Sequence, residues 1–215
     1  RTRCASMPTR RRKPPATQPD LMLRGLRLAL AAAALANAPP LLAQPQPVST
    51  PIDEVVDSAE VRRDGEMLRH RAANYLFPAS LGGMPARKLI VYGPGDMSIQ
   101  YTLRGGANGD GWIDLYVYPK DVPLAEEAAA TDEIIREHYK GKSIPVPQGF
   151  AAAEKGVASG WYDATIGGQP YLTHYQLAHH GDWAVKVRFS MPVDAAPDVR
   201  ERAAAALATF PTRWR

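Results

Sequence analysis

The chain has 215 residues, with 26 lysine and arginine side chains against 22 aspartate and glutamate side chains, a formal net charge of +4. Residues 1–43 carry eight of the basic side chains and one of the acidic ones, so residues 44–215 hold 18 basic and 21 acidic side chains, a net charge of −3. This balance argues against nucleic-acid binding, which needs clustered basic side chains on the working domain. Cys4 is the single cysteine, so residues 44–215 have neither a disulfide nor a cysteine nucleophile or metal ligand.

Residues 22–43 have the layout of a secretory signal peptide. Two arginines follow Met22, an apolar run of leucine and alanine comes next, and Ala43 is the small residue at the expected cleavage position. The apolar run is shorter than the about 20 residues that a membrane-spanning helix needs. A lipoprotein would carry cysteine at the position of Gln44, so no stable membrane anchor is expected after processing. We therefore expect a mature protein that is periplasmic or secreted.

Other segments surround this signal. Residues 1–21 are rich in arginine, proline and threonine and have no apolar periodicity, so we interpret them as an upstream extension that is not native, with a basic disordered tail as the alternative. After the signal, residues 44–51 are expected to form a mobile linker rich in proline and glutamine. Residues 52–71 carry many charges and few large apolar side chains, which leaves a short helix and an edge strand open. Residues 72–215 are expected to form a single domain.

The first group of predicted elements consists of three strands and a helix. Residues 88–92 form an apolar run, residues 97–104 alternate between apolar and polar with a period of two, and residues 112–118 place alternate apolar side chains on one face. Glycine-rich turns separate these strands. Apolar residues at three- and four-residue spacing then predict a helix that begins near Pro123 and ends at Gly141.

The second group repeats this order. Strands are predicted over residues 150–156, 158–166, 171–178 and 183–191, and a closing helix over residues 197–210. Because short turns join the strands, the strands are expected to pair antiparallel. The sequence therefore predicts an α+β fold, with helices packed on a single antiparallel sheet in the order strands, helix, strands, helix.

The register of the last predicted hairpin follows from its loop. A three-residue loop over residues 179–181, with the glycine in the left-handed conformation, would pair Ala178 with Asp182. A slip of one residue would bring polar residues of one strand opposite valines of the other, so burial favours the three-residue loop.

In this register one face of the hairpin carries four polar side chains: His174, Gln176, Lys186 and Arg188. Such a group could bind a small anionic ligand or an acidic protein partner. The alternative is that helix carboxylates, Glu133 or Glu137, cover this face in ordinary surface ion pairs.

Three parts of the chain carry a resemblance to known proteins. They are residues 75–78 with 81–83, residues 114–118, and residues 180–188. Together with the order of the elements over residues 75–210, they resemble uncharacterised exported proteins of proteobacteria and the PsbP/DcrB-like group of small α–β–α sandwiches. The resemblance implies a fold and an accessory or binding role. It includes no catalytic motif, so no functional residue is taken from it.

Two carboxylates suggest an enzymatic alternative. Asp114 and Asp163 each lie in a predicted strand among aromatic side chains, and two carboxylates in one cleft can act as acid and base on a glycoside. On that reading the protein is a hydrolase of envelope polymers. The motifs of a nucleophile elbow, a phosphate-binding loop, a dinucleotide-binding fold and a zinc-binding helix are absent from the sequence. No catalytic residue and no cofactor are therefore assigned.

A third alternative is a loose metal carrier. His179, His180 and Asp182 lie together at the predicted hairpin tip, but a closed metal site needs three or four converging ligands. A polar hairpin tip is the simpler interpretation. The function that the sequence favours is that of a non-enzymatic accessory protein, which binds a partner or a small ligand through the face of its sheet.

Overall fold

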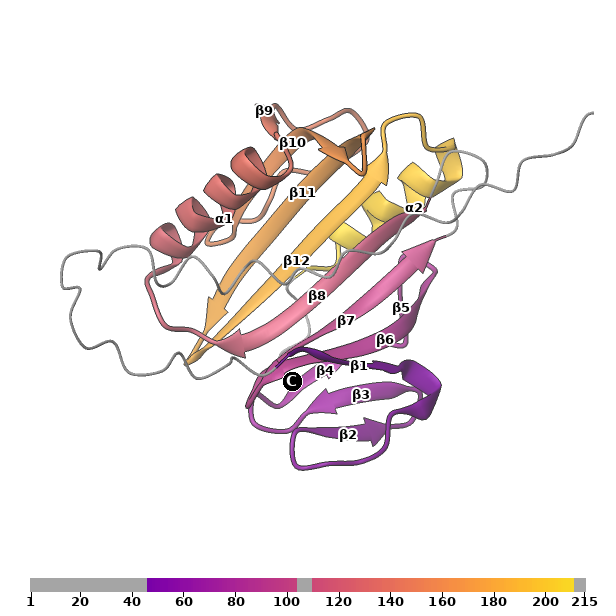
Figure 1. Cartoon of the computed structure of the whole chain (residues 1–215), viewed down its shortest axis with the longest axis vertical. Coiled ribbons are helices and arrows are strands. Elements are labelled where there is room, and N and C mark those ends of the chain that lie inside the picture. Colours follow the sequence, from indigo (N-terminus) through magenta and orange to yellow (C-terminus); the bar gives the residue numbers. More distant parts are fainter. Residues whose placement is uncertain (1–45, 104–109, 211–215) are drawn as a thin grey trace, which may run out of the picture. The chain divides into compact units, whose positions relative to one another are not determined.

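The computed structural model describes residues 46–103 and 110–210, and these residues are mostly β (Figure 1). Of them, 49% lie in strands and 18% in helices. Within these ranges the strands form two antiparallel sheets and are accompanied by two α-helices. The predicted α+β fold with a single sheet is therefore wrong. The second sheet and the low helix content make this a predominantly β structure.

Nine strands form the large sheet. Their bounds are β1 (Val48–Pro51), β5 (Ser80–Leu81), β6 (Met84–Gly93), β7 (Asp96–Leu103), β8 (Gly111–Pro119), β9 (Lys142–Ile144), β10 (Ala158–Ile166), β11 (Gln169–His180) and β12 (Trp183–Pro192). The order across the sheet is β1-β6-β7-β8-β12-β11-β10-β9, and β5 pairs with the first residues of β6.

The remaining elements are a small sheet, a short 3-10 helix and two α-helices. The small sheet has the order β2-β3-β4. Its strands are β2 (Val61–Asp64), β3 (Met67–His70) and β4 (Tyr75–Phe77), and the short 3-10 helix η2 (Ile52–Glu54) comes before them. Helix α1 (Leu124–His138) connects β8 to β9, and helix α2 (Pro197–Leu207) follows β12.

Two three-stranded meanders build the large sheet. Strands β6, β7 and β8 pair in the order of the sequence, as do β10, β11 and β12. The meanders join where β12 pairs with β8. Because side chains alternate along a strand and neighbouring strands are in register, each residue of β8, β10, β11 and β12 can be assigned to one of two faces.

We call one side of the sheet the α2 face. Apolar side chains of β8 and β12 point to it: Ile113, Leu115, Val117, Val185, Val187, Phe189 and Met191. These side chains pack with α2 and with the small sheet in one apolar cluster. Each fully buried side chain of this size stabilises the fold by about 1.5–3 kcal/mol, so this cluster is the main core.

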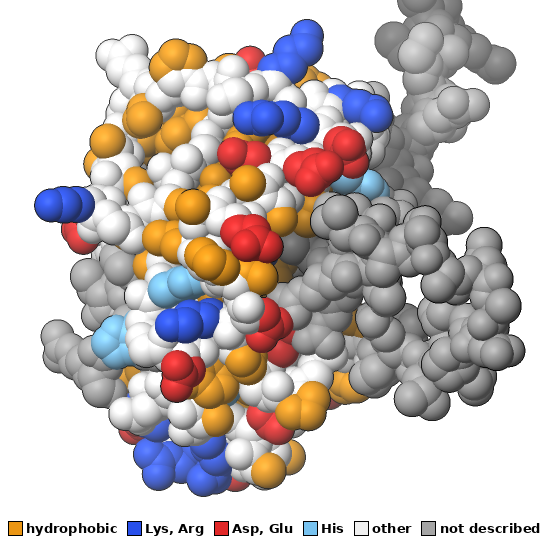
Figure 2. Space-filling view, turned by 90° about the vertical axis from the view of Figure 1, so that its left-hand side faces the viewer, with side chains coloured by type: hydrophobic (Ala, Val, Ile, Leu, Met, Phe, Trp, Pro, Cys, Tyr) orange, Lys and Arg blue, Asp and Glu red, His pale blue; other side chains and the backbone are white. Residues whose placement is uncertain are grey.

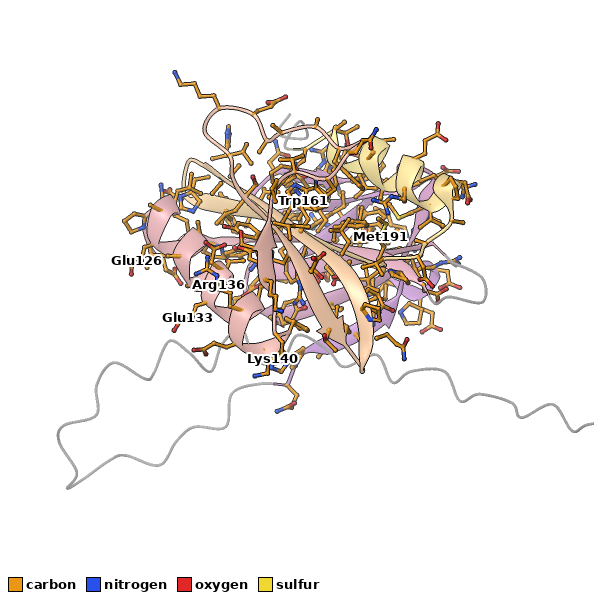
Figure 3. All side chains as sticks on the ribbon, turned by 90° about the horizontal axis from the view of Figure 1, so that it is seen from above. Glu126, Glu133, Arg136, Lys140, Trp161 and Met191 are labelled. Carbon is orange, nitrogen blue, oxygen red and sulfur yellow. The ribbon has the colours of Figure 1, made fainter. Side chains whose placement is uncertain are left out.

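The opposite side of the sheet is the α1 face. It carries Tyr116, Tyr118, Tyr175 and Leu177, which form a second cluster with α1. Viewed along the sheet in Figure 3, the two helices lie on opposite sides of it, and the labelled carboxylates of α1 point away from the strands. Figure 2 shows this side of the molecule, where acidic and basic side chains are interspersed with apolar ones over the described surface.

Most predicted strands and both predicted helices are confirmed, with shifts at their ends. The prediction of a strand over residues 150–156 is wrong, since this stretch contains neither helix nor strand. Its first residue, Phe150, packs its ring against Trp161. The expected mobile linker instead contributes β1, which pairs with β6. Residues 52–71 contain η2, β2 and β3. The predicted signal peptide, residues 22–43, lies outside the described residues, as do residues 1–21.

The register predicted for the last hairpin is also wrong. His180 pairs with Trp183 across a two-residue turn, in which Gly181 has a φ of +56°. Glycine at the first central position is what a type II′ turn requires. The burial argument failed because both faces of β11 and β12 are covered, so apolar side chains such as Tyr175 and Leu177 lie opposite charged ones.

Candidate functional site

The candidate site is a group of buried charges on the α1 face. Lys186 and Arg188 alternate with apolar residues along β12 and point to this face. Asp114 of β8 lies directly opposite Arg188. The exposed fractions are 5% for Lys186, 6% for Arg188 and 7% for Asp114. These are the buried side chains with a formal charge in the described parts of the chain, and we call them the charge cluster.

Tyrosine rings surround the two cations. The guanidinium carbon of Arg188 lies 4.2 Å from the centre of the Tyr139 ring, just beyond the end of α1. The ammonium nitrogen of Lys186 lies 5.1 Å from the Tyr116 ring and 5.4 Å from the Tyr118 ring. Cation–π contacts of this length stabilise a desolvated cation by about 2 kcal/mol. The rings therefore hold the cations in place without removing their charge.

The carboxylate of the cluster is held by an amide. Gln100 of β7 donates from Nε2 to Oδ1 of Asp114 over 3.0 Å. The cluster as a whole contains two cations and one carboxylate. A guanidinium and an ammonium group both donate strong hydrogen bonds to carboxylates and phosphates. The charge cluster is thus suited chemically to an anion.

Helix α1 is joined to the same face through carboxylates. The Tyr118 hydroxyl donates to Glu127, whose other oxygen lies 2.8 Å from Nε2 of His179. The Tyr162 hydroxyl donates to Asp132, and burial together with this hydrogen bond raises the pKa of Tyr162. Glu127 and Asp132 are therefore engaged by tyrosines of the sheet, in polar contacts that attach the helix beside the charge cluster.

The comparisons with known proteins give no relative. No protein-family model, no curated protein and no solved structure matches this chain. The resemblance to the PsbP/DcrB-like group therefore stays a prediction. No helix in the described ranges is long and apolar enough to cross a membrane.

The predicted ligand site is divided between the two faces of the sheet. Lys186 and Arg188 belong to the charge cluster on the α1 face, whereas His174 and Gln176 point to the α2 face. His174 lies opposite Phe189, and Gln176 lies opposite Val187. The shifted hairpin register causes this division, because an odd shift moves every side chain of one strand to the other face.

The two carboxylates of the hydrolase hypothesis do not meet. Asp114 points to the α1 face, whereas Asp163 pairs with Leu172 on β11 and points, exposed, to the α2 face. Acid–base catalysis on a glycoside needs both carboxyl groups in one cleft, at most about 10 Å apart. The alternation of the strands therefore removes this pair as catalytic machinery.

The predicted metal ligands also diverge. His179 points to the α1 face and contacts Glu127, whereas His180, the next residue, points to the other face. Asp182 is exposed in the turn. No group of three or more histidine, cysteine, aspartate or glutamate side chains suited to a metal occurs among residues 46–103 and 110–210.

The tyrosines around the cluster were not predicted as site residues, and Asp114 was considered only as an acid–base residue and not as a neighbour of Lys186 and Arg188. A usable signal exists in β8, where Asp114, Tyr116 and Tyr118 stand two residues apart and so share a face. Alternation of this kind places the three side chains on one face, but it does not decide whether that face is polar or apolar. The pairing of this face with Lys186 and Arg188 depends on the contact between the two meanders, which lie far apart in sequence.

Proposed function

We propose that the protein is an exported, non-enzymatic binding protein that holds a small anionic ligand on the α1 face of its sheet. The observation that carries the proposal is the charge cluster, in which Lys186 and Arg188 are buried on the same face of β12 and Asp114 lies opposite Arg188. An arginine offers a planar fork of donors to a carboxylate or phosphate, and a lysine adds a point charge. The tyrosine rings beside them supply flat apolar walls.

The other functions that the sequence leaves open have less support. The hydrolase needs a pair of carboxylates that lie on opposite faces of the sheet. The metal carrier needs side chains that diverge at the hairpin tip. Binding is therefore the function that the arrangement of charges supports best, and a protein partner would have to offer an acidic side chain to the same two cations.

The ligand-binding part of the proposal is tested by thermal unfolding with inorganic phosphate, citrate and benzoate, each against sodium chloride at equal ionic strength. An anion at 100 times its dissociation constant stabilises the native state by about 2.7 kcal/mol. This corresponds to a melting temperature higher by about 5 °C or more for a chain of this length. We expect at least one of the three anions to produce such a shift.

Two variants and a control connect the shift to the cluster. Lys186→Met and Arg188→Met keep the apolar stem of each side chain and remove its charge, so each should abolish the stabilisation by the anion. Lys142→Met changes an exposed lysine of β9 and should leave it unchanged. Equal anion effects in all four proteins, or none in the wild type beyond that of chloride, would contradict the proposal.

Export has a separate test. Cell fractionation followed by N-terminal sequencing should find the protein outside the cytoplasm, beginning at Gln44. A protein that stays in the cytoplasm, or one whose sequence starts before Gln44, would contradict the predicted signal and cleavage site.

A further inference from the structure

Two buried hydrogen-bond acceptors lie together on the α2 face, away from the charge cluster. His174 and Gln176 stand two residues apart on β11 and point to the same side. Their exposed fractions are 1% and 6%. Neither Nε2 of His174 nor Oε1 of Gln176 receives a hydrogen bond from the described parts of the chain.

The role of each histidine nitrogen follows from its neighbour. Nδ1 of His174 lies 2.8 Å from the carbonyl oxygen of Gly160, and since a carbonyl only accepts, Nδ1 carries the proton and donates. Nε2 therefore presents a lone pair. The carbonyl oxygen of Gln176 presents another. A buried acceptor without a donor is unfavourable, so a pair of them on one face indicates a position for a donor.

Aromatic side chains form the surroundings of this pair. The Trp161 ring stacks on the His174 ring, with 3.9 Å between centroids and 15° between planes. Phe150 lies 4.6 Å from the Trp161 ring and belongs to residues 145–157, a long segment without helix or strand. Loops of this length in a compact domain are often functional. Phe150 connects this segment to the stacked rings, since its own ring packs against Trp161.

The apolar surroundings define the charge of the occupant. Phe189 and Val187 lie opposite the two acceptors on β12. Burial among these apolar side chains disfavours a positive charge at this position, and it lowers the pKa of His174 to about 4. An ammonium or a metal cation would meet the same penalty. These surroundings fit a neutral group that can donate two hydrogen bonds.

We propose that His174 and Gln176 form a second binding site, which takes a neutral donor of two hydrogen bonds beneath Phe150. A buried water molecule and the NH₂ group of a small aromatic amide share this chemistry. The proposal goes beyond the anion site, because it concerns the other face of the sheet and none of the residues of the charge cluster.

The first experiment uses the sign of a stability change. Gln176→Met removes the acceptor and keeps much of the volume. With a donor bound, the donor loses a partner and the melting temperature falls by about 2–4 °C. Without one, the substitution relieves an unmet acceptor and the melting temperature rises. Gln169→Met, at an exposed position of the same strand, controls for the chemistry of the change and should be neutral.

The second experiment identifies the donor. A crystal structure of the whole chain should show an atom about 2.7–3.2 Å from both Nε2 of His174 and Oε1 of Gln176. Benzamide and N,N-dimethylbenzamide, which lacks the donors, are then compared by thermal unfolding. Stabilisation by benzamide alone, lost in Gln176→Met, assigns the site to an amide ligand. No stabilisation by either, with density for a water, assigns it to water.

Two results would overturn the proposal. One is a higher melting temperature of Gln176→Met than of the wild type. The other is a structure in which the Gln176 amide is rotated by 180°, so that its nitrogen donates directly to Nε2 of His174 and no third group is needed.

Discussion

Arg188 of β12 lies directly opposite Asp114 of β8, and both side chains are buried on the α1 face of the large sheet. This is the seam at which the two meanders meet. A shift of one residue along this seam would move one of the two side chains to the apolar α2 face. Buried charges can fix a register in this way, at some loss of stability. We infer that the charge cluster fixes the register of the sheet, in addition to forming the proposed anion site.

The role of Asp114 predicts a loss of stability on neutralisation. Asp114→Asn leaves Lys186 and Arg188 without the carboxylate of the cluster, and removing one member of a buried ionic group costs about 3–5 kcal/mol. We expect a lower free energy of unfolding of this size in urea titrations. Asp163→Asn, exposed on the other face, should stay within about 0.5 kcal/mol of the wild type. Equal effects of the two substitutions would contradict a buried role for Asp114.

His174 predicts a dependence of stability on pH. Burial lowers its pKa from the ordinary 6.5 to about 4, so between these values the unfolded chain binds more protons than the native one. The contribution is complete above pH 6.5 and is lost as the pH falls to about 4, in total about 3 kcal/mol. Urea titrations at pH 7, 5.5 and 4.5 should show this loss in the wild type, beyond that of His174→Phe. Parallel pH profiles of the two proteins would show that His174 is not held neutral.

The sequence predicted the elements whose pattern is local. Strands β7 and β8 alternate or run apolar between glycine-rich turns, and α1 has a regular apolar spacing, so each could be found without knowledge of its neighbours. Strand β1 could not be found in this way. Its four residues, Val48–Pro51, include two polar side chains and end in proline, and they form a strand because β6 offers an edge to pair with.

Of the four predicted ligand-binding residues, Lys186 and Arg188 belong to the charge cluster, whereas His174 and Gln176 do not. The reason is related. Lys186 and Arg188 were identified from their alternation along one strand, which is a local property. Their neighbours across the hairpin depend on register, and register is set by burial only where one face is exposed to solvent. Both faces of β11 are covered, one by α1 and one by the main core. The pattern of apolar residues therefore could not decide between registers, and His174 was placed on the wrong face.

A second buried histidine predicts a local opening in acid. Ala73 donates its backbone N–H to Nδ1 of His70 over 3.1 Å, so Nε2 carries the proton and donates to the Gly95 carbonyl oxygen over 3.2 Å. Burial lowers the pKa of His70, which favours this neutral form. Protonation places a hydrogen on Nδ1 against the Ala73 N–H. Below the ordinary value of 6.5 the native state therefore loses stability as the pH falls through the lowered pKa.

Hydrogen exchange measures this opening. We expect the amides of Ala73 and Gly95 to lose protection as the pH is lowered from 7 to 5, after correction for the intrinsic rates, while that of Ala203 in α2 stays protected. Glu60 accepts from the Gly95 N–H over 2.9 Å, and its charge raises the pKa of His70. Glu60→Gln should therefore move the onset of opening to lower pH. An onset at higher pH would contradict this assignment.

Alanine substitutions at two glycines distinguish the cost of backbone strain from the cost of a steric clash. Gly82, in the turn between β5 and β6, has a φ of +52°, and an added Cβ would lie 2.1 Å from the backbone oxygen of Arg202 and 2.9 Å from the nitrogen of Ala206. Gly65, in the turn between β2 and β3, has a φ of +64° and nothing within 4 Å of an added Cβ. Alanine is strained at both positions, by about 1–2 kcal/mol. Only at Gly82 must the backbone of α2 also move.

The expected costs differ accordingly. Gly65→Ala should lower the free energy of unfolding by the strain alone, about 1–2 kcal/mol. Gly82→Ala adds a clash of about 1–3 kcal/mol, giving about 2–5 kcal/mol in urea titrations. Because the clash is with α2, the helix should also lose amide protection in Gly82→Ala and keep it in Gly65→Ala. Equal costs, with α2 protected in both variants, would show that the helix does not pack against this turn.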